Sequence, residues 1–245
     1  MMRAVAAGTP RPIPPREKWY AEPAQVFDNV YFIGTKEHNS WAIKTSAGII
    51  ILDTMFNYAA EEEIIGGLKK LGLNPADIKY VIVSHGHGDH DEGAALLQSR
   101  YGAHVVMGAA DWDLIEKNPD IPGGIPKRDI VAQDGQKITL GDSSVTIITT
   151  PGHTLGTLSM IFTVKDRGKP LTVAYSGGTA FNFPSTAANF ETYIQSQRKM
   201  AAAENNPLEL EPRLAAIMAQ EYPRFSDAEY ARRHRLSPSP RRAAW

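Results

Sequence analysis

Apolar residues in this chain gather in short, β-branched runs that end in glycine or polar residues. Runs of this length and composition are typical of buried strands. The pattern predicts strands at 30–33, 40–43, 49–52, 79–84, 105–107, 145–149, 158–164 and 171–175. A turn is expected at 140–143, before the strand at 145–149, and another at 165–168, between the last two strands.

Helical spacing of apolar residues separates several of these strands. Ile64, Ile65, Leu68 and Leu71 recur at helical intervals, and Gly72 is a suitable stop for a helix at 59–71. Further helices are expected at 92–101, 111–117 and 187–203. Strands and helices that alternate in two successive blocks indicate an α/β protein with two sheets packed face to face and helices outside. This is a four-layer αββα sandwich.

The composition allows a full hydrophobic core and narrows the class of ligand. The chain has 245 residues, of which 42% are hydrophobic. A net charge of −1 argues against electrostatic capture of nucleic acid or an anionic membrane, so a small molecule is the expected partner. The absence of cysteine excludes disulfides and thiolate metal sites. No apolar run approaches the roughly 20 residues of a membrane span.

The two ends of the chain differ in composition from its middle. A proline-rich stretch predicts an extended arm over residues 1–25, before a main domain at 26–222. The basic, Ser/Pro-rich residues 223–245 predict a flexible tail. Met1–Gly8 is too short and too weakly apolar for an export signal. The expected compartment is periplasmic or extracellular if a signal peptide was trimmed, and cytoplasmic otherwise.

The loop after the strand at 79–84 carries the strongest chemical signal. His85, His87, Asp89 and His90 fall within six residues. The carboxyl end of a buried strand is where open α/β sheets place ligand sites, and the intervening glycines allow a sharp loop. Imidazole and carboxylate donors without thiolate fit Zn²⁺ or a similar ion. The alternative interpretation is a polar, His-rich surface loop.

His153 is the candidate that completes a metal site. It follows the strand at 145–149, and Pro151-Gly152 turns the chain there, so the imidazole leaves the sheet at a strand end. A structural histidine is the alternative. Together with His85 and His87 it would form a three-nitrogen site with an open fourth position, which is the arrangement of a catalytic zinc.

A second, weaker metal position is expected beside the first. Asp89 and His90 lie on the other edge of the loop and could hold a second ion. Asp53 ends a buried strand, where an unpaired charge is costly. A hydrogen bond to the second ring nitrogen of a metal-bound histidine would satisfy this carboxylate. We therefore expect one tight zinc site, a possible looser one, and Asp53 behind a ligand.

Three segments resemble motifs of the metallo-β-lactamase superfamily of metal-dependent hydrolases. Residues 85–90 match its His-x-His-x-Asp-His signature. Residues 48–54 resemble its early strand that ends in a structural aspartate, and 150–154 resemble the motif with the next metal-binding histidine. The resemblance covers about residues 26–200 and implies the αββα fold.

The resemblance also implies an activity. Ala110–Asp113 and Asp134-Gly135 are most similar to relatives of the third metallo-β-lactamase subclass. The implied reaction is attack of metal-bound hydroxide on an amide or ester-like carbonyl, with a β-lactam as the first substrate hypothesis. Asp89 would orient the hydroxide and help to protonate the leaving group. Hydrolysis of a lactone, thioester or sulfate ester is the alternative within the same class, and a non-catalytic metal-binding domain is the rival from another class.

Two positions depart from the family pattern, and both concern the second ion. Gly177-Gly178 stands where many members carry Gly-Asp, although the lactamase branches also lack that aspartate. Asn206 stands nearest to the expected last metal-binding histidine, and an amide oxygen is a poor zinc ligand. Alternative ligands for the second ion are Glu204, Glu209, Glu211 and His234.

The remaining histidines and one tryptophan carry weaker expectations. His38, on a loop before a strand, is either an exposed residue or part of the pocket lining. His104 precedes a strand and is interpreted as structural, and the surroundings of His234 are typical of a solvated surface. Trp112 is expected to pack within a short helix.

Overall fold

Two β-sheets form the centre of the structure, a computed structural model that describes residues 12–184, 186–203 and 208–209. The first sheet holds seven strands in chain order: β1 (Ala24–Phe27), β2 (Val30–Phe32), β3 (Trp41–Thr45), β4 (Gly48–Leu52), β5 (Ile78–Ile82), β6 (His104–Gly108) and β7 (Ile130–Ala132). The second has the order β12-β11-β10-β9-β8, with β8 (Lys137–Leu140), β9 (Ser143–Thr149), β10 (Leu158–Asp166), β11 (Lys169–Tyr175) and β12 (Leu208–Glu209).

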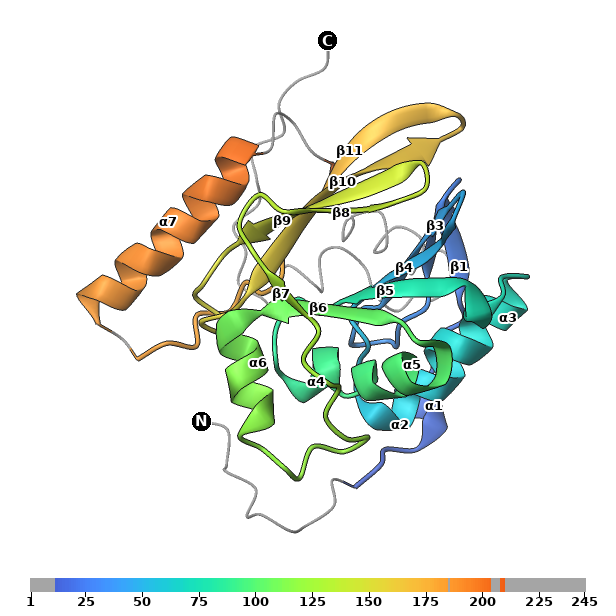
Figure 1. The fold of residues 1–245 in the computed structure, drawn as a ribbon, viewed down its shortest axis with the longest axis horizontal. Coiled ribbons are helices and arrows are strands. Elements are labelled where there is room, and N and C mark those ends of the chain that lie inside the picture. Colours follow the sequence, from blue (N-terminus) through green and yellow to red (C-terminus); the bar gives the residue numbers. More distant parts are fainter. Residues whose placement is uncertain (1–11, 185, 204–207, 210–245) are drawn as a thin grey trace. The chain divides into compact units, whose positions relative to one another are not determined.

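Helices lie outside these sheets. Between β1 and β7 the chain forms α2 (Asn57–Ala60), the π-helical segment η1 (Glu61–Gly66), α3 (Gly67–Lys70), the 3₁₀ turn η2 (Pro75–Asp77), α4 (Gly88–Asp91), α5 (Ala94–Tyr101) and α6 (Ala109–Glu116). The short α1 (Arg16–Trp19) precedes them, and α7 (Ala187–Ala203) follows β11. Figure 1 shows α2 to α6 on one face of the first sheet and α7 beside the second sheet.

Alternation along β4 explains this layering. Ile49 and Ile51 pack with Ile64 and Leu68 in the core between the first sheet and its helices. Because successive strand residues point to opposite faces, the fully buried Ile50 must face the second sheet. On the outer side of the second sheet, Met200 of α7 packs against Ile148 and Ala174. The predicted four-layer αββα sandwich is therefore confirmed.

The pairing of strands decides where functional side chains gather. Strands β1 to β4 pair antiparallel, whereas β4, β5, β6 and β7 pair parallel. The described pairs of the second sheet, β8 to β11, are antiparallel. Since parallel strands end at the same edge, the loops after β4 and β5 lie side by side. Asp53 and His85 occupy these two loops.

Most predicted elements are present, and the structure differs from the prediction in several places. The helix predicted at 59–71 is the continuous run α2-η1-α3, and Gly72 ends it with a φ of 72°. Strands β7, β8 and β12 were not predicted, since they have only three, four and two residues. The range 1–25 that we assigned to an arm contains α1 and the first two residues of β1, and Trp19 is 7% exposed. The predicted tail at 223–245 lies outside the described residues.

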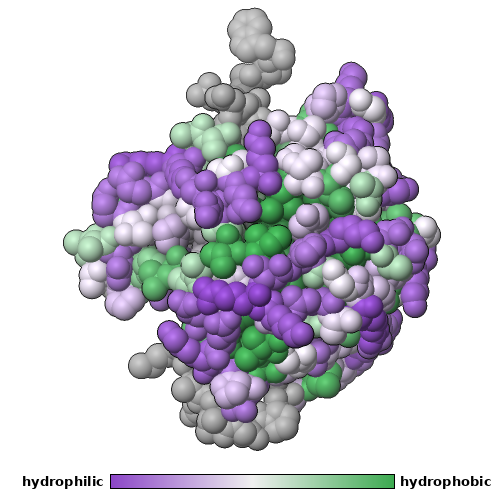
Figure 2. Space-filling model, in the orientation of Figure 1, coloured by the Kyte–Doolittle hydropathy of each residue, from purple (hydrophilic) through white to green (hydrophobic). Residues whose placement is uncertain are grey.

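The face drawn in Figure 2 is largely hydrophilic, with hydrophobic residues in separate patches between hydrophilic ones. Within the part of the chain that the structure describes, no helix combines the length and apolar character needed to span a bilayer.

A carboxyl group is buried inside η1. Glu63 is 0% exposed; its Oε1 accepts a hydrogen bond from the Ala21 N–H at 3.0 Å, while its Oε2 has no partner among the described residues. Burial raises the pKa of Glu63 to about 8. An unfolded chain exposes the same group, where its pKa is about 4.3.

We expect the Glu63→Gln variant to have a flatter dependence of stability on pH. Between about pH 4.3 and pH 8 the folded protein keeps the Glu63 proton while the unfolded chain loses it, so rising pH favours unfolding. The variant lacks this group, and its advantage in Tm should grow from pH 5 to pH 8. Glu62→Gln, at an exposed neighbour, is the control. Parallel Tm curves for Glu63→Gln and wild type would contradict the assignment.

Candidate metal centre

Five metal-competent side chains converge beyond the carboxyl ends of the strands. His85, His87 and His153 offer ligand atoms that all lie within 4.8 Å of one another, and so do His85, Asp89 and His90. The structure therefore brings together every nominated ligand whose side chain it describes. It does so from two loops, one after β5 and one after β9.

The loop after β5 is compact because one glycine lies against a helix. A Cβ on Gly86 would lie 3.1 Å from the Ile115 side chain and 3.3 Å from Asp111, both on α6. The φ of Gly86 is not positive, so its backbone conformation does not call for glycine. The close approach to α6 is the reason for a residue without a side chain here. Beyond it the chain does not stay irregular, as the sequence had indicated, but winds into α4, and the His90 N–H donates to the His87 carbonyl at 2.7 Å.

His85 is the best oriented donor of the cluster. His85 is 1% exposed, and its Nδ1 lies 2.7 Å from the Gly177 carbonyl oxygen. If Nδ1 donates there, Nε2 is an acceptor, and this buried atom has no partner among the described residues. Burial and then the neighbouring imidazoles lower the pKa of His85. A neutral imidazole with an unshared, buried nitrogen is what a metal ion requires.

His87 and His153 complete the triad. His87 Nδ1 lies 3.1 Å from His153 Nε2, close to the roughly 3.3 Å that separates two nitrogens on one tetrahedral zinc. The other nitrogen of His153 lies 2.9 Å from the Ala180 carbonyl oxygen, which fixes the ring. Burial, and then the His153 ring, lowers the pKa of His87. The donor set and its outer hydrogen bonds thus fit Zn²⁺.

Asp53 occupies the predicted place behind a histidine. It is 0% exposed, and its Oδ2 lies 2.8 Å from His90 Nδ1. It also accepts hydrogen bonds from the Ser84 N–H at 2.6 Å and from the Tyr175 hydroxyl. Burial opposes protonation of His90, but the Asp53 carboxylate outweighs it and raises the pKa of His90. With Nδ1 engaged, His90 Nε2 faces Asp89, 3.6 Å from Oδ2.

Asp111 is a functional residue to which the sequence analysis gave no role. It is 1% exposed and accepts hydrogen bonds from the Gly86 N–H at 3.0 Å, the Thr154 hydroxyl at 2.7 Å and the Gly156 N–H at 3.3 Å. Burial raises its pKa. One carboxyl group therefore joins both metal-bearing loops. The sequence did carry a sign of this role, because Asp111 lies one helical turn before Ile115 and therefore on the buried side of α6.

We expect Asp111→Ala to weaken zinc binding at the triad by about 10–100-fold, the usual cost of removing an outer partner of a metal site. The two loops would lose their common acceptor, so the three imidazoles would no longer be held at one spacing. Asp113→Ala is the matched control, because Asp113 lies on the same helix and pairs with Arg128 at the surface. Competition with a chromogenic chelator measures both variants. Equal zinc affinity in the two would show that Asp111 does not position the loops.

The other residues that the sequence analysis considered lie outside the triad. Trp112 is fully buried and donates to the Ile130 carbonyl, as a packing residue does. His104 pairs with Asp129 at the surface, and His38 Nε2 lies 3.9 Å from Asp89 Oδ2. Glu204, Asn206, Glu211 and His234 lie outside the described residues, and only the backbone of Glu209 is described.

Gly178 leaves no room for the carboxylate that many family members carry there. A Cβ at this position would lie 2.6 Å from the His153 Cβ and 2.7 Å from its Cγ, closer than real contacts allow. The backbone of Gly178 thus packs directly against a triad histidine. An aspartate in its place would displace His153.

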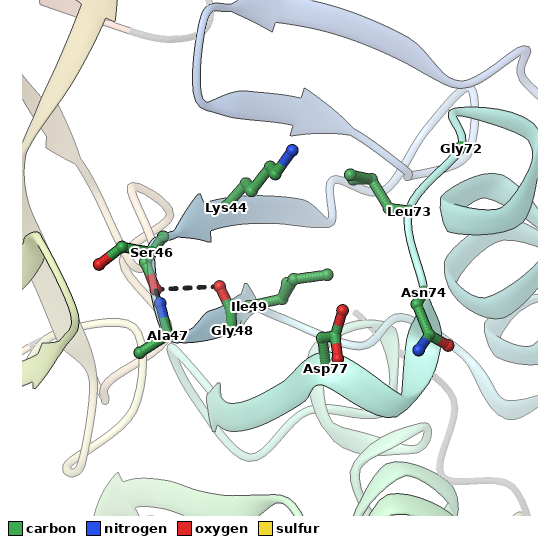
Figure 3. A pocket seen from close by; sticks show the side chains of 10 residues that line it. Lys44, Ser46, Ala47, Gly48, Ile49, Gly72, Leu73, Asn74 and Asp77 are labelled. Carbon is green, nitrogen blue, oxygen red and sulfur yellow. Dashed lines mark hydrogen bonds between the residues drawn. The ribbon is translucent and has the colours of Figure 1, made fainter.

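A depression of about 410 Å³ lies at the opposite end of the first sheet. It is formed where β4 and β5 begin, and Ile49 and Leu73 line it between Lys44 and Asp77 (Figure 3). It contains no histidine, and we place the site at the histidine cluster, where donors of the right chemistry converge.

Known proteins resemble this chain in sequence. Residues 33–166 match the Metallo-beta-lactamase superfamily. The hydroxyacylglutathione hydrolase of Acidiphilium cryptum is 31% identical over 155 residues, which are 63% of this chain and 55% of that protein. The N-acyl homoserine lactonase of Agrobacterium fabrum is 33% identical over 122 residues, 45% of each chain. The chain therefore spans about half the length of these two relatives.

Solved structures resemble it over more of its length. A subclass B3 metallo-beta-lactamase of Bradyrhizobium japonicum superimposes with a TM-score of 0.69 and 30% identity, covering 84% of this chain and 83% of the other. The metallo-beta-lactamase from Legionella gormanii gives a TM-score of 0.66 and 26% identity, covering 78% and 76%.

Proposed function

The chain belongs to the metallo-beta-lactamase superfamily, and from this premise we propose that it is a zinc-dependent hydrolase of an amide or ester-like carbonyl. A β-lactam or a related cyclic amide is the proposed substrate. The observation that carries the proposal is the buried, unpartnered Nε2 of His85, which faces the imidazoles of His87 and His153. One nitrogen from each of these three histidines would hold the ion. A zinc ion held in this way acts as a Lewis acid and lowers the pKa of a bound water to about 7.

Asp89 is the proposed proton-handling residue. Its side chain is 33% exposed, so it reaches solvent while it lies beside the donors of the triad. A carboxylate there accepts a hydrogen bond from an attacking water and can return the proton to the leaving group. The His153 ring is held by its contact with the Ala180 carbonyl oxygen, and the His87 ring lies against the His153 imidazole. Asp53 and Asp111 keep the two loops in register.

Two observations favour a cyclic amide over a thioester. Gly178 leaves no room for a carboxylate between two ions, because a Cβ there would meet His153, and the resemblance to the lactamase branches implies the same absence. The subclass B3 enzyme of Bradyrhizobium japonicum matches most of both chains, whereas the hydroxyacylglutathione hydrolase is matched over 55% of its length. Hydrolysis of a hydroxyacylglutathione or an N-acyl homoserine lactone remains the second candidate, because sequence identity to those enzymes exceeds 30%.

A substrate panel tests the proposal. The zinc-loaded protein is assayed with nitrocefin, a hydroxyacylglutathione and an N-acyl homoserine lactone at equal concentration. The proposal expects the highest kcat/KM for nitrocefin and its loss after zinc is removed. A higher value for either other substrate would replace the β-lactam as the substrate class. Zinc binding without turnover of any of the three would favour the non-catalytic metal-binding alternative.

A further inference from the structure

We propose that His38 supplies a protein donor to the second metal position, beside Asp89 and His90. The inference rests on the proposed function, since it assigns a ligand within the same site. It concerns a residue that precedes β3 and lies more than forty positions before the histidine loop. The chemistry of the ligand is a divalent cation that accepts imidazole and carboxylate donors, such as Zn²⁺.

The second position has too few donors of its own among the described residues. The group around it consists of His85, Asp89 and His90, but the free Nε2 of His85 also belongs to the triad with His87 and His153. Among the residues that the structure describes, Asp89 and His90 alone are then left exclusively for a second ion. Zinc sites in proteins use three or four protein donors, so a further residue is required.

His38 lies at the right place to be that residue. Its Nε2 is 3.9 Å from Asp89 Oδ2, and His90 Nε2 is 3.6 Å from the same oxygen. Donors on one tetrahedral zinc are separated by about 3.3 Å. The His38 contact would therefore need to shorten by about 0.6 Å and the His90 contact by about 0.3 Å for the three side chains to share one ion.

The backbone of His38 is held in this position. Thr35 Oγ1 accepts a hydrogen bond from the His38 N–H at 2.9 Å, and the Thr35 N–H donates to the His38 carbonyl at 2.8 Å. Gly34 lies against the same turn, since a Cβ there would lie 2.6 Å from the His38 carbonyl oxygen. These contacts make a rigid turn rather than a loose loop, and rigid support is what a metal ligand needs.

The imidazole ring is oriented as well. Phe56 packs against it edge to face, with 4.9 Å between ring centres, and the His38 side chain is 21% exposed. A histidine that served only as a solvated surface group would not need this packing. The ring is thus directed toward Asp89 by Phe56 on one side and by the Thr35 turn on the other.

Metal titration tests the assignment. Co²⁺ and Zn²⁺ are titrated into metal-free wild type, His38→Ala and His104→Ala, with visible absorption of cobalt and calorimetry as readouts. Wild type should bind one tight and one weaker equivalent. His38→Ala should keep the tight equivalent and bind the weaker one at least tenfold less well. His104→Ala, which removes a surface imidazole paired with Asp129, should behave as wild type.

The outcomes separate this inference from the proposed function. Unchanged affinity for the second equivalent in His38→Ala would overturn the inference, and so would a wild type that binds a single equivalent. The tight equivalent would persist in both cases, and the proposed function would stand. Loss of the tight equivalent from wild type itself would instead refute the proposed function and the inference together. Circular dichroism and Tm equal to wild type establish that the variants are folded.

Discussion

His87→Ala should abolish the tight zinc equivalent and lower hydrolysis more than about 100-fold. Removing an outer partner of a metal site already costs about 10–100-fold in affinity or activity, and His87 is proposed as one of only three direct donors. Its Nδ1 lies 3.1 Å from His153 Nε2, so the variant would leave a two-nitrogen site. Elemental analysis after dialysis against a mild chelator measures bound zinc, and initial rates with nitrocefin measure activity.

The control for this prediction is His104→Ala, because His104 is 58% exposed at its side chain and pairs with Asp129 away from the cluster. It should retain zinc and rate. A His87→Ala protein that kept one full equivalent after dialysis would show that the triad is not the tight site.

Asp53→Ala should destabilise the fold by about 3–5 kcal/mol, the cost of breaking a buried ionic network by removing one partner. The carboxylate accepts hydrogen bonds from Ser84 and Tyr175 and contacts His90. Each buried donor that is left unsatisfied costs about 1–3 kcal/mol. Asp53 also has a φ of 58°, a left-handed conformation that alanine tolerates poorly.

Asp53→Asn should lose less stability, since asparagine tolerates this φ and keeps an acceptor oxygen. It should still weaken the second metal equivalent, because a neutral amide supports the His90 tautomer less strongly than a carboxylate. Urea unfolding and zinc titration measure the two effects. Asp77→Ala, at an exposed carboxylate, is the control for stability. An unfolding free energy for Asp53→Ala within 1 kcal/mol of wild type would contradict the network described here.

Hydrophobic periodicity predicted the layers of this fold because strands such as β4 carry nearly unbroken runs of buried apolar residues. The apolar residues before Asp53 and those before His85 both predicted strands. The metal-binding chemistry of the residues that follow these strands indicated the site. The α7 helix was predicted over the same residues that it occupies. Strand β8 was missed because it has only four residues and its last residue, Leu140, belongs to the turn that we predicted at 140–143.

Contacts between distant segments could not be predicted from the sequence. Asp111 joins Gly86 to Thr154, which are 68 positions apart, and no local pattern encodes such a bridge. The approach of His38 to Asp89 depends on the pairing of β3 with β4, which brings the preceding turn to the same edge. The role of Gly178 likewise emerges only once its backbone is seen against His153.

The central claim is that three imidazoles bind one tight zinc ion and that this ion is required for hydrolysis. Stepwise addition of Zn²⁺ to the metal-free protein, with binding heat and nitrocefin turnover recorded on the same samples, tests it most directly. We expect hydrolysis to appear in proportion to the first equivalent, with a further change as the weaker second equivalent binds. Hydrolysis at full rate in the metal-free protein, or the absence of a tight first equivalent, would contradict the account.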